Sequence, residues 1–378
     1  MALQGVAVEG VHKKNLGKQM KTGILTFHRA HNYGAVLQCY ALQEILKRRG
    51  HEVHVIDYRQ PWIEEFYKFL SWRILRMKAS SVSGLVEYVK SDLKKFIVSP
   101  HRKSFFEDFR STYLNVTSPC GKIDLPQDFD CYVIGSDQLW SLHCLGGETD
   151  DVYMGDFPRM EGSRVIGYAI SADLKSVEEI SDRLPEWRKN FDALSMREKE
   201  IADKVAGLSG SPCDVCLDPT LLTDPEIWDP VIDDRWASRK YVLVYEVRWK
   251  KDTRGLLKKK AEELAAQIGE DCEVIVLSGM RYPVKDFVSL FKYARHVVTT
   301  SFHGIVFSIL FETPFHALPL WGGYDLRYKE LLCSLGAEDR LVDFDDVLKP
   351  GQMDFTEIHR RLGERQKASL EFISKNIG

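Results

Sequence analysis

Residues 297–311 read VVTTSFHGIVFSILF and combine a short apolar strand, a polar break and an apolar helix. Paired valines and threonines are typical of a strand that is buried on both faces. Ser301 is a good N-cap, and we expect its hydroxyl to accept hydrogen bonds from the first helical amides. The pattern places His303 at the carboxyl end of a strand, where open α/β sheets bind ligands and a helix start attracts anions. A histidine that only satisfies local backbone groups is the alternative.

The rest of the chain alternates strands and helices, which predicts an α/β fold with two Rossmann-like domains facing a cleft. A strand at 23–27, a helix at 35–49 and a strand at 51–57 open the first domain. No G-x-G-x-x-G motif follows the first strand, so a dinucleotide site is not supported. The predicted division is a leader or tag at 1–20, an N-terminal domain at 21–222 with a helical insert at about 60–117, a linker at 223–239, a C-terminal domain at 240–348 and a terminal helix at 349–378 that packs back across the domains.

Composition excludes several classes of protein. The chain has 378 residues, of which 44% are hydrophobic and 28% charged, and its net charge is −3. A general nucleic-acid binder would be strongly basic, and no apolar run reaches the roughly 18 residues of a membrane span. The eight cysteines are scattered, and the only C-x-x-C, Cys213 to Cys216, lacks a second pair at zinc-ligand spacing. We therefore expect a reduced, cytoplasmic protein without a metal site.

The helical insert at about 60–117 is rich in aromatic and basic residues. Such a segment can rest on an anionic membrane surface or cover an active site, and a solvated helical face is the third reading. Interleaved acidic residues weaken the membrane interpretation.

Two further strand ends carry polar residues. Gly135, Ser136 and Asp137 follow a strand at 129–134, where the glycine and serine would let backbone amides approach a ligand. Asp137 would offer an ionised acceptor for a sugar hydroxyl. Arg197 ends another strand, and its planar guanidinium can bind a carboxylate or phosphate through two hydrogen bonds. Its alternative is an ion pair with a local acid.

Short motifs in this chain resemble those of the polysaccharide pyruvyl transferase family. Ser301-Phe302-His303-Gly304 resembles the family's Ser/Arg–aromatic/Leu–His–Gly signature. The other motifs that match, in the family's order, are Asn32-Tyr33-Gly34, Gly135 to Trp140, Ser195 to Glu198, Asp218-Pro219-Thr220 and Arg327 just ahead of a helix. The resemblance spans about Thr22 to Leu341 and implies an architecture like that of type-B glycosyltransferases. Plain turn chemistry is the alternative for Asn32 and Gly34.

The resemblance implies transfer of a pyruvyl group from phosphoenolpyruvate to two hydroxyls of one sugar, which forms a cyclic ketal. The acceptor would be a galactose- or mannose-type glycan of a capsule or exopolysaccharide, either free or lipid-linked. Phosphoenolpyruvate would be a co-substrate, and no metal or other cofactor is implied. The protein would act in the cytoplasm, with a peripheral position at the inner face of the membrane as a variant of this expectation.

The resemblance also implies roles for individual residues. His303 would protonate the enol carbon, and Asp137 would accept a hydroxyl proton. Arg197, Arg327 and the amides near Gly304 would hold the anionic donor. The remaining substrate-binding candidates are Asn32, Gly34, Gly135, Ser136, Ser301 and Phe302.

One position departs from the family pattern. Some members carry arginine where this chain has Ser301, and serine cannot supply that charge. Either other basic residues bind the donor, or the donor differs. A type-B glycosyltransferase that uses a nucleotide-sugar and a non-catalytic glycan-binding relative are the alternative functions.

Overall fold

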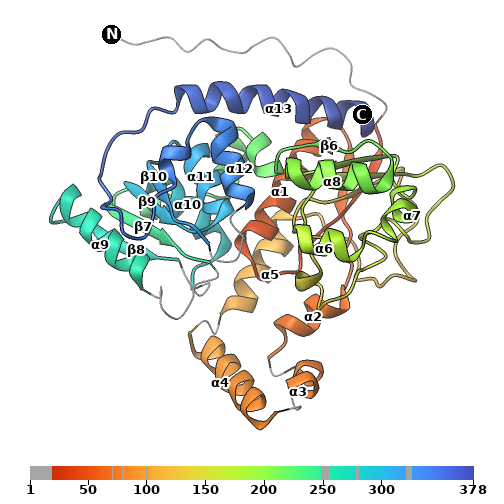
Figure 1. Cartoon of the computed structure of the whole chain (residues 1–378), viewed down its shortest axis with the longest axis horizontal. Coiled ribbons are helices and arrows are strands. Elements are labelled where there is room, and N and C mark those ends of the chain that lie inside the picture. The colour runs from red at the N-terminus through yellow and green to blue at the C-terminus, as the bar shows by residue number, and fades with distance from the viewer. Residues whose placement is uncertain are drawn as a thin grey trace.

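The structure is a computed structural model that describes residues 19–69, 71–78, 81–98, 101–247, 255–277, 281–320 and 326–378. Two parallel β-sheets, one in each half of the chain, are flanked by helices (Figure 1). The predicted α/β fold with two Rossmann-like domains is thus confirmed. Residues 1–18 of the predicted leader lie outside the described residues.

The N-terminal sheet has six parallel strands in the order β2-β1-β3-β4-β5-β6. Their bounds are β1 Lys21–Leu25, β2 Glu52–Val55, β3 Cys131–Ile134, β4 Arg164–Ile170, β5 Ala193–Met196 and β6 Asp214–Val215. The chain leaves β1 in one direction to form β2 and returns to form β3 on the other side. The strand order therefore reverses between β1 and β3, and a crevice is expected outside their carboxyl ends.

The helices of this half are α1 Tyr33–Arg48, α2 Pro61–Tyr67, α3 Trp72–Lys78, α4 Val82–Val98, α5 Arg102–Tyr113, α6 Leu174–Glu179, α7 Leu184–Arg188 and α8 Lys199–Ser209. The predicted insert at about 60–117 contains α2 to α5, of which α3 and α4 extend from the body of the molecule (Figure 1). None of the helices in the described parts of the chain is long and apolar enough to cross a membrane.

The C-terminal sheet has four parallel strands in the order β10-β9-β7-β8. Its elements are β7 Tyr241–Tyr245, α9 Leu256–Ile268, β8 Glu273–Val276, α10 Val284–Tyr293, β9 His296–Thr299, α11 Phe302–Leu310, β10 Phe315–Ala317 and α12 Leu326–Leu335. Here the order reverses between β7 and β9. The loop after β9, which leads to His303, is therefore at the ligand-binding edge of this sheet.

Helix α1 joins the two halves. The ring of Tyr33 stacks on that of Phe287 in α10, with 4.8 Å between centroids. The Tyr40 hydroxyl donates a hydrogen bond to the carbonyl of Ile227, at 3.0 Å. Ile227 lies in a 3-10 helix, Pro225–Val231, within the predicted linker. A continuous apolar core thus runs from the first domain into the second.

The last helix, α13 Thr356–Asn376, lies across both halves (Figure 1). It packs on α12 in the second domain. In the first domain, Gln366 Nε2 donates to the Leu221 carbonyl at 2.7 Å, and Ser369 Oγ accepts from the Leu217 amide at 3.0 Å. Helix α13 therefore contacts both domains and connects them.

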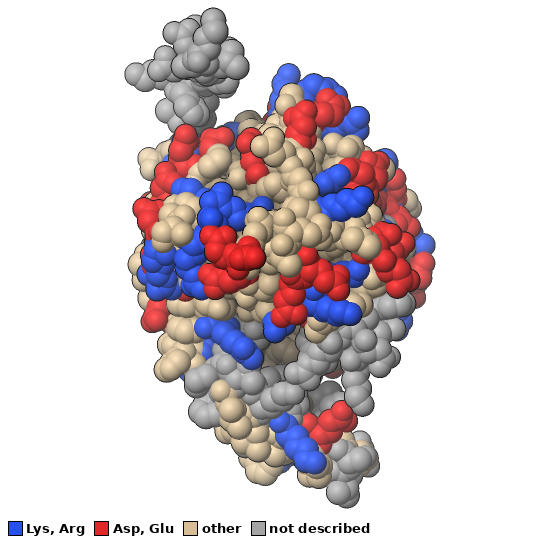
Figure 2. All heavy atoms as spheres, turned by 90° about the vertical axis from the view of Figure 1, so that its left-hand side faces the viewer, with Lys and Arg blue, Asp and Glu red and all other residues tan. Residues whose placement is uncertain are grey.

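Charged side chains do not gather by sign on the face drawn in Figure 2, which lies on the α9 side of the molecule. Lysines and arginines alternate there with aspartates and glutamates, in keeping with the net charge of −3. Such a face lacks the basic stripe of a nucleic-acid interface.

Candidate functional site

His303 lies in the first turn of α11, at the end of β9, where the sequence places it. Its side chain is 11% exposed, and Nε2 lies 3.6 Å from Oδ2 of Asp218 in the opposite domain. Gly304 permits this position, because a Cβ on it would meet Thr299 Oγ1 at 2.2 Å. The helix can therefore start directly against the strand end.

Ser301 occupies the N-cap position of α11, but its side chain makes no capping hydrogen bond, so that expectation is wrong. Its backbone amide donates to Thr299 Oγ1 at 3.0 Å. Its hydroxyl bonds instead with Tyr245, which slightly offsets the rise that burial causes in the pKa of that tyrosine. The first turn of α11 therefore receives no side-chain cap from Ser301, and its amides face the cleft with the positive end of the helix dipole.

Gly34, in the first turn of α1, packs against His303 from the other domain. A Cβ on Gly34 would lie 2.1 Å from Nδ1 of the imidazole. Only glycine allows this approach. Asn32 is exposed and is the N-cap of α1, accepting from the Ala35 amide at 3.3 Å, which is the structural role left open for it.

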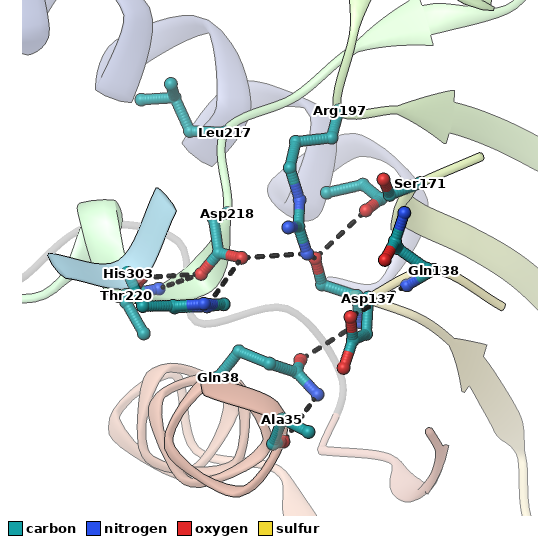
Figure 3. Close-up of polar contacts among 12 residues, drawn as sticks. Ala35, Gln38, Asp137, Gln138, Ser171, Arg197, Leu217, Asp218, Thr220 and His303 are labelled. Atoms are coloured by element: carbon teal, nitrogen blue, oxygen red, sulfur yellow. Dashed lines mark hydrogen bonds and ion pairs between the residues drawn. The ribbon is translucent and has the colours of Figure 1, made fainter. Parts of the chain in front are cut away.

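Arg197 and Asp218 form a buried ion pair beside His303 (Figure 3). Arg197 Nη2 lies 2.8 Å from Asp218 Oδ2, and the two side chains are 4% and 0% exposed. Burial raises the pKa of Asp218, but Arg197 and His303 lower it more, so the pKa falls well below its usual range and the carboxylate stays charged. Thr220 donates its amide to Oδ1 of the same group, at 2.9 Å.

The two predicted donor arginines meet over one aromatic ring. The guanidinium carbon of Arg197 lies 5.1 Å from the centroid of Phe302, and that of Arg327 lies 6.0 Å from it. Arg197 Nε and Nη1 have no hydrogen-bond partner among the described residues. The cavity between these groups measures about 20 Å³, room for one water. A larger ligand must therefore displace side chains to enter.

Gly135 and Ser136 serve the structure of the first domain. The Gly135 amide donates to the Leu25 carbonyl at 3.0 Å, and the Ser136 amide donates to Gln38 Oε1 at 3.2 Å. These two amides are therefore engaged inside the protein, where the sequence suggested that they approach a ligand. The hydroxyl of Ser136 remains in the site, because it accepts a hydrogen bond from Arg197 Nη2.

Asp137 follows with a positive φ of 92°. Its carboxylate accepts from the adjacent Gln138 amide at 2.8 Å, and the described contacts do not join it to His303. It acts electrostatically on Tyr67, whose pKa is raised by burial and, in smaller part, by Asp137. The side chain of Asp137 is thus near the helical insert.

Sequence reasoning missed Asp218 and Glu198 as site residues. Asp218 pairs with both Arg197 and His303. Glu198 is buried, accepts from Ser171 Oγ at 2.6 Å and has a pKa raised by burial, although Arg197 and Arg327 oppose the rise. Both residues lie in motifs that the sequence shows, at or near the ends of strands, so their position in the chain was a usable signal.

Across the described ranges, no three histidine, cysteine, aspartate or glutamate side chains are grouped to hold a metal ion. The described cysteines are all free.

The fold and the site together define an α/β protein with a charged, acid–base site at the facing strand ends of two Rossmann-like domains. The family model for polysaccharide pyruvyl transferase matches residues 32–320. The chain belongs to this family, as the motifs indicate.

Solved structures with a similar fold include the glycosyltransferase SnogD from Streptomyces nogalater, at 13% identity and a TM-score of 0.41, covering 95% of this chain and 100% of that one. A putative UDP-N-acetylglucosamine 2-epimerase from Listeria monocytogenes is 10% identical, with a TM-score of 0.42, and the match covers 93% of this chain and 97% of that one. Both TM-scores are below 0.5, so no property of this chain follows from these likenesses. A search of curated proteins gave no match.

Proposed function

We propose that the protein transfers the pyruvyl group of phosphoenolpyruvate to two hydroxyls of one sugar in a polysaccharide or its precursor. The observation that carries this proposal is the meeting of His303, Asp218 and two arginines around Phe302. These residues come from both domains, and the family match supports the same reaction class. The acceptor would be a galactose- or mannose-type glycan, and the site of action the cytoplasm.

The donor is a small anion with a carboxylate and a phosphate. The Nε and Nη1 of Arg197, which have no described hydrogen-bond partner, can bind one of these groups, and the Arg327 guanidinium lies 6.0 Å from the centroid of the same Phe302 ring. The start of α11 adds further positive potential. This set of positive groups compensates for the serine at position 301, where some relatives carry arginine.

The proposed chemistry begins when the imidazolium of His303 protonates the methylene carbon of phosphoenolpyruvate, giving an oxocarbenium-like centre at C2. Asp218, which stays ionised, stabilises the charged imidazole. One sugar hydroxyl adds to C2 and loses its proton to Asp137. The C2–O bond to phosphate then breaks, and the second hydroxyl forms the second C–O bond. The second hydroxyl gives its proton to His303, which restores the imidazolium, and the proton taken by Asp137 leaves with phosphate.

Phosphate release in the presence of phosphoenolpyruvate and a galactoside tests the proposal. We expect release only when both are present, and a loss of about 10²- to 10⁴-fold in His303→Ala. His359→Ala is the matched control, because His359 lies on α13 and pairs with Glu312 at 3.0 Å, and neither residue lines the cavity beside Arg197.

Other outcomes would contradict the proposal. Sugar transfer from a nucleotide-sugar would identify a glycosyltransferase, and glycan binding without turnover would identify a non-catalytic relative. Full activity of His303→Ala would remove this histidine from the mechanism.

A further inference from the structure

A second cavity lies beside the loop that leads into α1. Its volume is about 760 Å³, and its walls are α2, α5 and the segments after β1 and β2. His31 lines it, and Gly34, three residues later, packs on His303. The ring of Phe106 in α5 stacks on His31 and also lies 5.5 Å from that of Tyr33. The cavity and the His303 site are therefore on two sides of one short loop.

Arg110 in α5 is the feature of this cavity that lacks a structural explanation. Its side chain is only 6% exposed and lines the cavity. Neither Nη1 nor Nη2 has a hydrogen-bond partner among the described residues. The Glu107 carboxylate lies 4.0 Å from Nη2, beyond hydrogen-bond reach. Buried charged groups normally have hydrogen-bond partners, so a buried guanidinium that lines a cavity with Nη1 and Nη2 unsatisfied indicates an anionic ligand.

The acids of the same wall are already engaged by other cations. Asp57 accepts from His28 Nε2 at 3.0 Å and from Arg59 Nη2 at 2.7 Å. Glu64 accepts from Arg29 Nε at 2.9 Å. The carboxylates of Asp57, Glu64 and Glu107 still attract the Arg110 guanidinium from a distance. None of the described acids, however, forms a hydrogen bond with its Nη1 or Nη2.

The cavity has a positive potential that a buried histidine reports. The pKa of His31 falls from 6.5 to about 3. Burial of the ring is the largest cause, and four cations add to it, of which Arg102 and Arg110 have the strongest effect. Burial and the charge of Arg29 lower the pKa of Arg110 to about 10, although Glu107, Asp57 and Glu64 oppose the fall, so the guanidinium is still charged at neutral pH.

We propose that this cavity binds a phosphate or diphosphate group of the sugar acceptor, with Arg110 as its principal ligand. The planar guanidinium suits two phosphate oxygens. The role as an acceptor site rests on the proposed function, in which the donor binds near His303. Tyr67, which lines the cavity, is within electrostatic range of Asp137, the proposed base. In this proposal the sugar attached to the bound diphosphate lies on the Tyr67 side of the cavity, toward Asp137.

Two kinds of activated sugar carry this diphosphate, those linked to a polyprenyl carrier and those linked to a nucleoside. Phe69 lines the cavity and is 51% exposed, and Trp72, which lines a neighbouring cavity together with Lys68, is 76% exposed. Apolar side chains at the rim are compatible with a lipid chain that leaves the cavity. The shared diphosphate is the part that the charges recognise.

Calorimetric titration of the whole protein with inorganic pyrophosphate tests the site directly. We expect Arg110→Gln to bind pyrophosphate roughly 10- to 100-fold more weakly than the unaltered protein, the loss typical of a charged hydrogen bond. Arg360→Gln, which removes an exposed charge from α13, is the matched control and should bind normally. Denaturant unfolding of Arg110→Gln should show little loss of stability, because no described group forms a hydrogen bond with Nη1 or Nη2.

Three results would overturn the site: no binding of pyrophosphate, equal binding by Arg110→Gln, or displacement of pyrophosphate by phosphoenolpyruvate. Farnesyl diphosphate and UDP then distinguish a polyprenyl carrier from a nucleoside carrier. The compound that resembles the natural carrier should bind more tightly than pyrophosphate, and its binding should depend on Arg110. Equal affinity for all three would assign recognition to the diphosphate alone.

A kinetic assay of phosphate release separates this proposal from the proposed function. With a glycosyl diphosphate acceptor, Arg110→Gln should raise KM for the acceptor and leave KM for phosphoenolpyruvate unchanged. Arg110-dependent pyrophosphate binding without any phosphate release would contradict the pyruvyl transfer only. Phosphate release without Arg110-dependent binding would contradict the acceptor site only.

Discussion

Arg197 and Arg110 are both buried arginines in the first domain, but their surroundings differ. Arg197 has the Asp218 carboxylate 2.8 Å away, whereas the Glu107 carboxylate is 4.0 Å from Arg110. The cavity beside Arg197 measures about 20 Å³ and that beside Arg110 about 760 Å³. In the first region, around Arg197, the charges pair with one another and leave little space, so a substrate must displace side chains to enter. In the second region, around Arg110, two guanidinium nitrogens without a hydrogen-bond partner line a large cavity.

The largest effect on stability is expected when the ion pair of the first region, between Arg197 and Asp218, is removed. Arg197→Gln should lower the free energy of unfolding by about 3–5 kcal/mol, because it leaves the buried Asp218 carboxylate without its partner. Urea unfolding followed by circular dichroism measures this. Arg110→Gln should change the same quantity by less than about 1 kcal/mol. Equal losses in the two variants would contradict the contrast between a paired and an unpaired arginine.

A smaller effect is expected where the two domains touch at the imidazole. In Gly34→Ala the new methyl would lie 2.1 Å from His303 Nδ1, so the ring must move. We expect a loss of about 1–3 kcal/mol in unfolding free energy, together with loss of phosphate release.

Gly207→Ala controls for the loss of a glycine. Gly207 lies in α8, and a Cβ there would meet nothing within 4 Å. Because alanine favours helix, this variant should gain about 0.5–1 kcal/mol and keep its activity. Normal activity in Gly34→Ala would show that the position of the imidazole is not essential.

Much of the first region is predictable from the sequence because parallel strands place their carboxyl ends at one edge. Ser136, Arg197 and His303 each come shortly after a predicted strand, so their convergence follows from the topology. Asp218 follows β6, a strand of two residues, Asp214–Val215, that is too short to give a periodic signal. The match of motifs pointed to Asp218, but only the fold shows that it pairs with residues of both domains.

The second region is not predictable in this way. Helix α5 has an ordinary amphipathic pattern, and Arg110 looks like any basic residue on a helix. What distinguishes Arg110 is that its neighbours, brought together from the segments after β1 and β2 and from α2, already pair with one another. The failed cap at Ser301 has a similar cause, since Tyr245 in β7 competes for the serine hydroxyl. Competition between partners distant in the chain is a property of the tertiary structure.

The smallest effect sharpens the comparison by using His31 as a probe of the second region. The pKa of His31 in the folded protein is about 3, below its ordinary value of 6.5, so the neutral ring is favoured. This contribution to stability is present above about pH 6.5 and is lost as the pH falls toward 3. A bound anion opposes the field of the four cations, so saturating pyrophosphate should raise the pKa of His31 by about one pH unit. NMR titration of the histidine ring protons, assigned with His31→Gln, measures this shift.

Arg110→Gln should also raise the pKa of His31, because it removes one of the cations, and Arg360→Gln should leave it unchanged. A pKa of His31 that does not respond to pyrophosphate would place the anion elsewhere, and the contrast between the two arginines would then have no bearing on ligand binding.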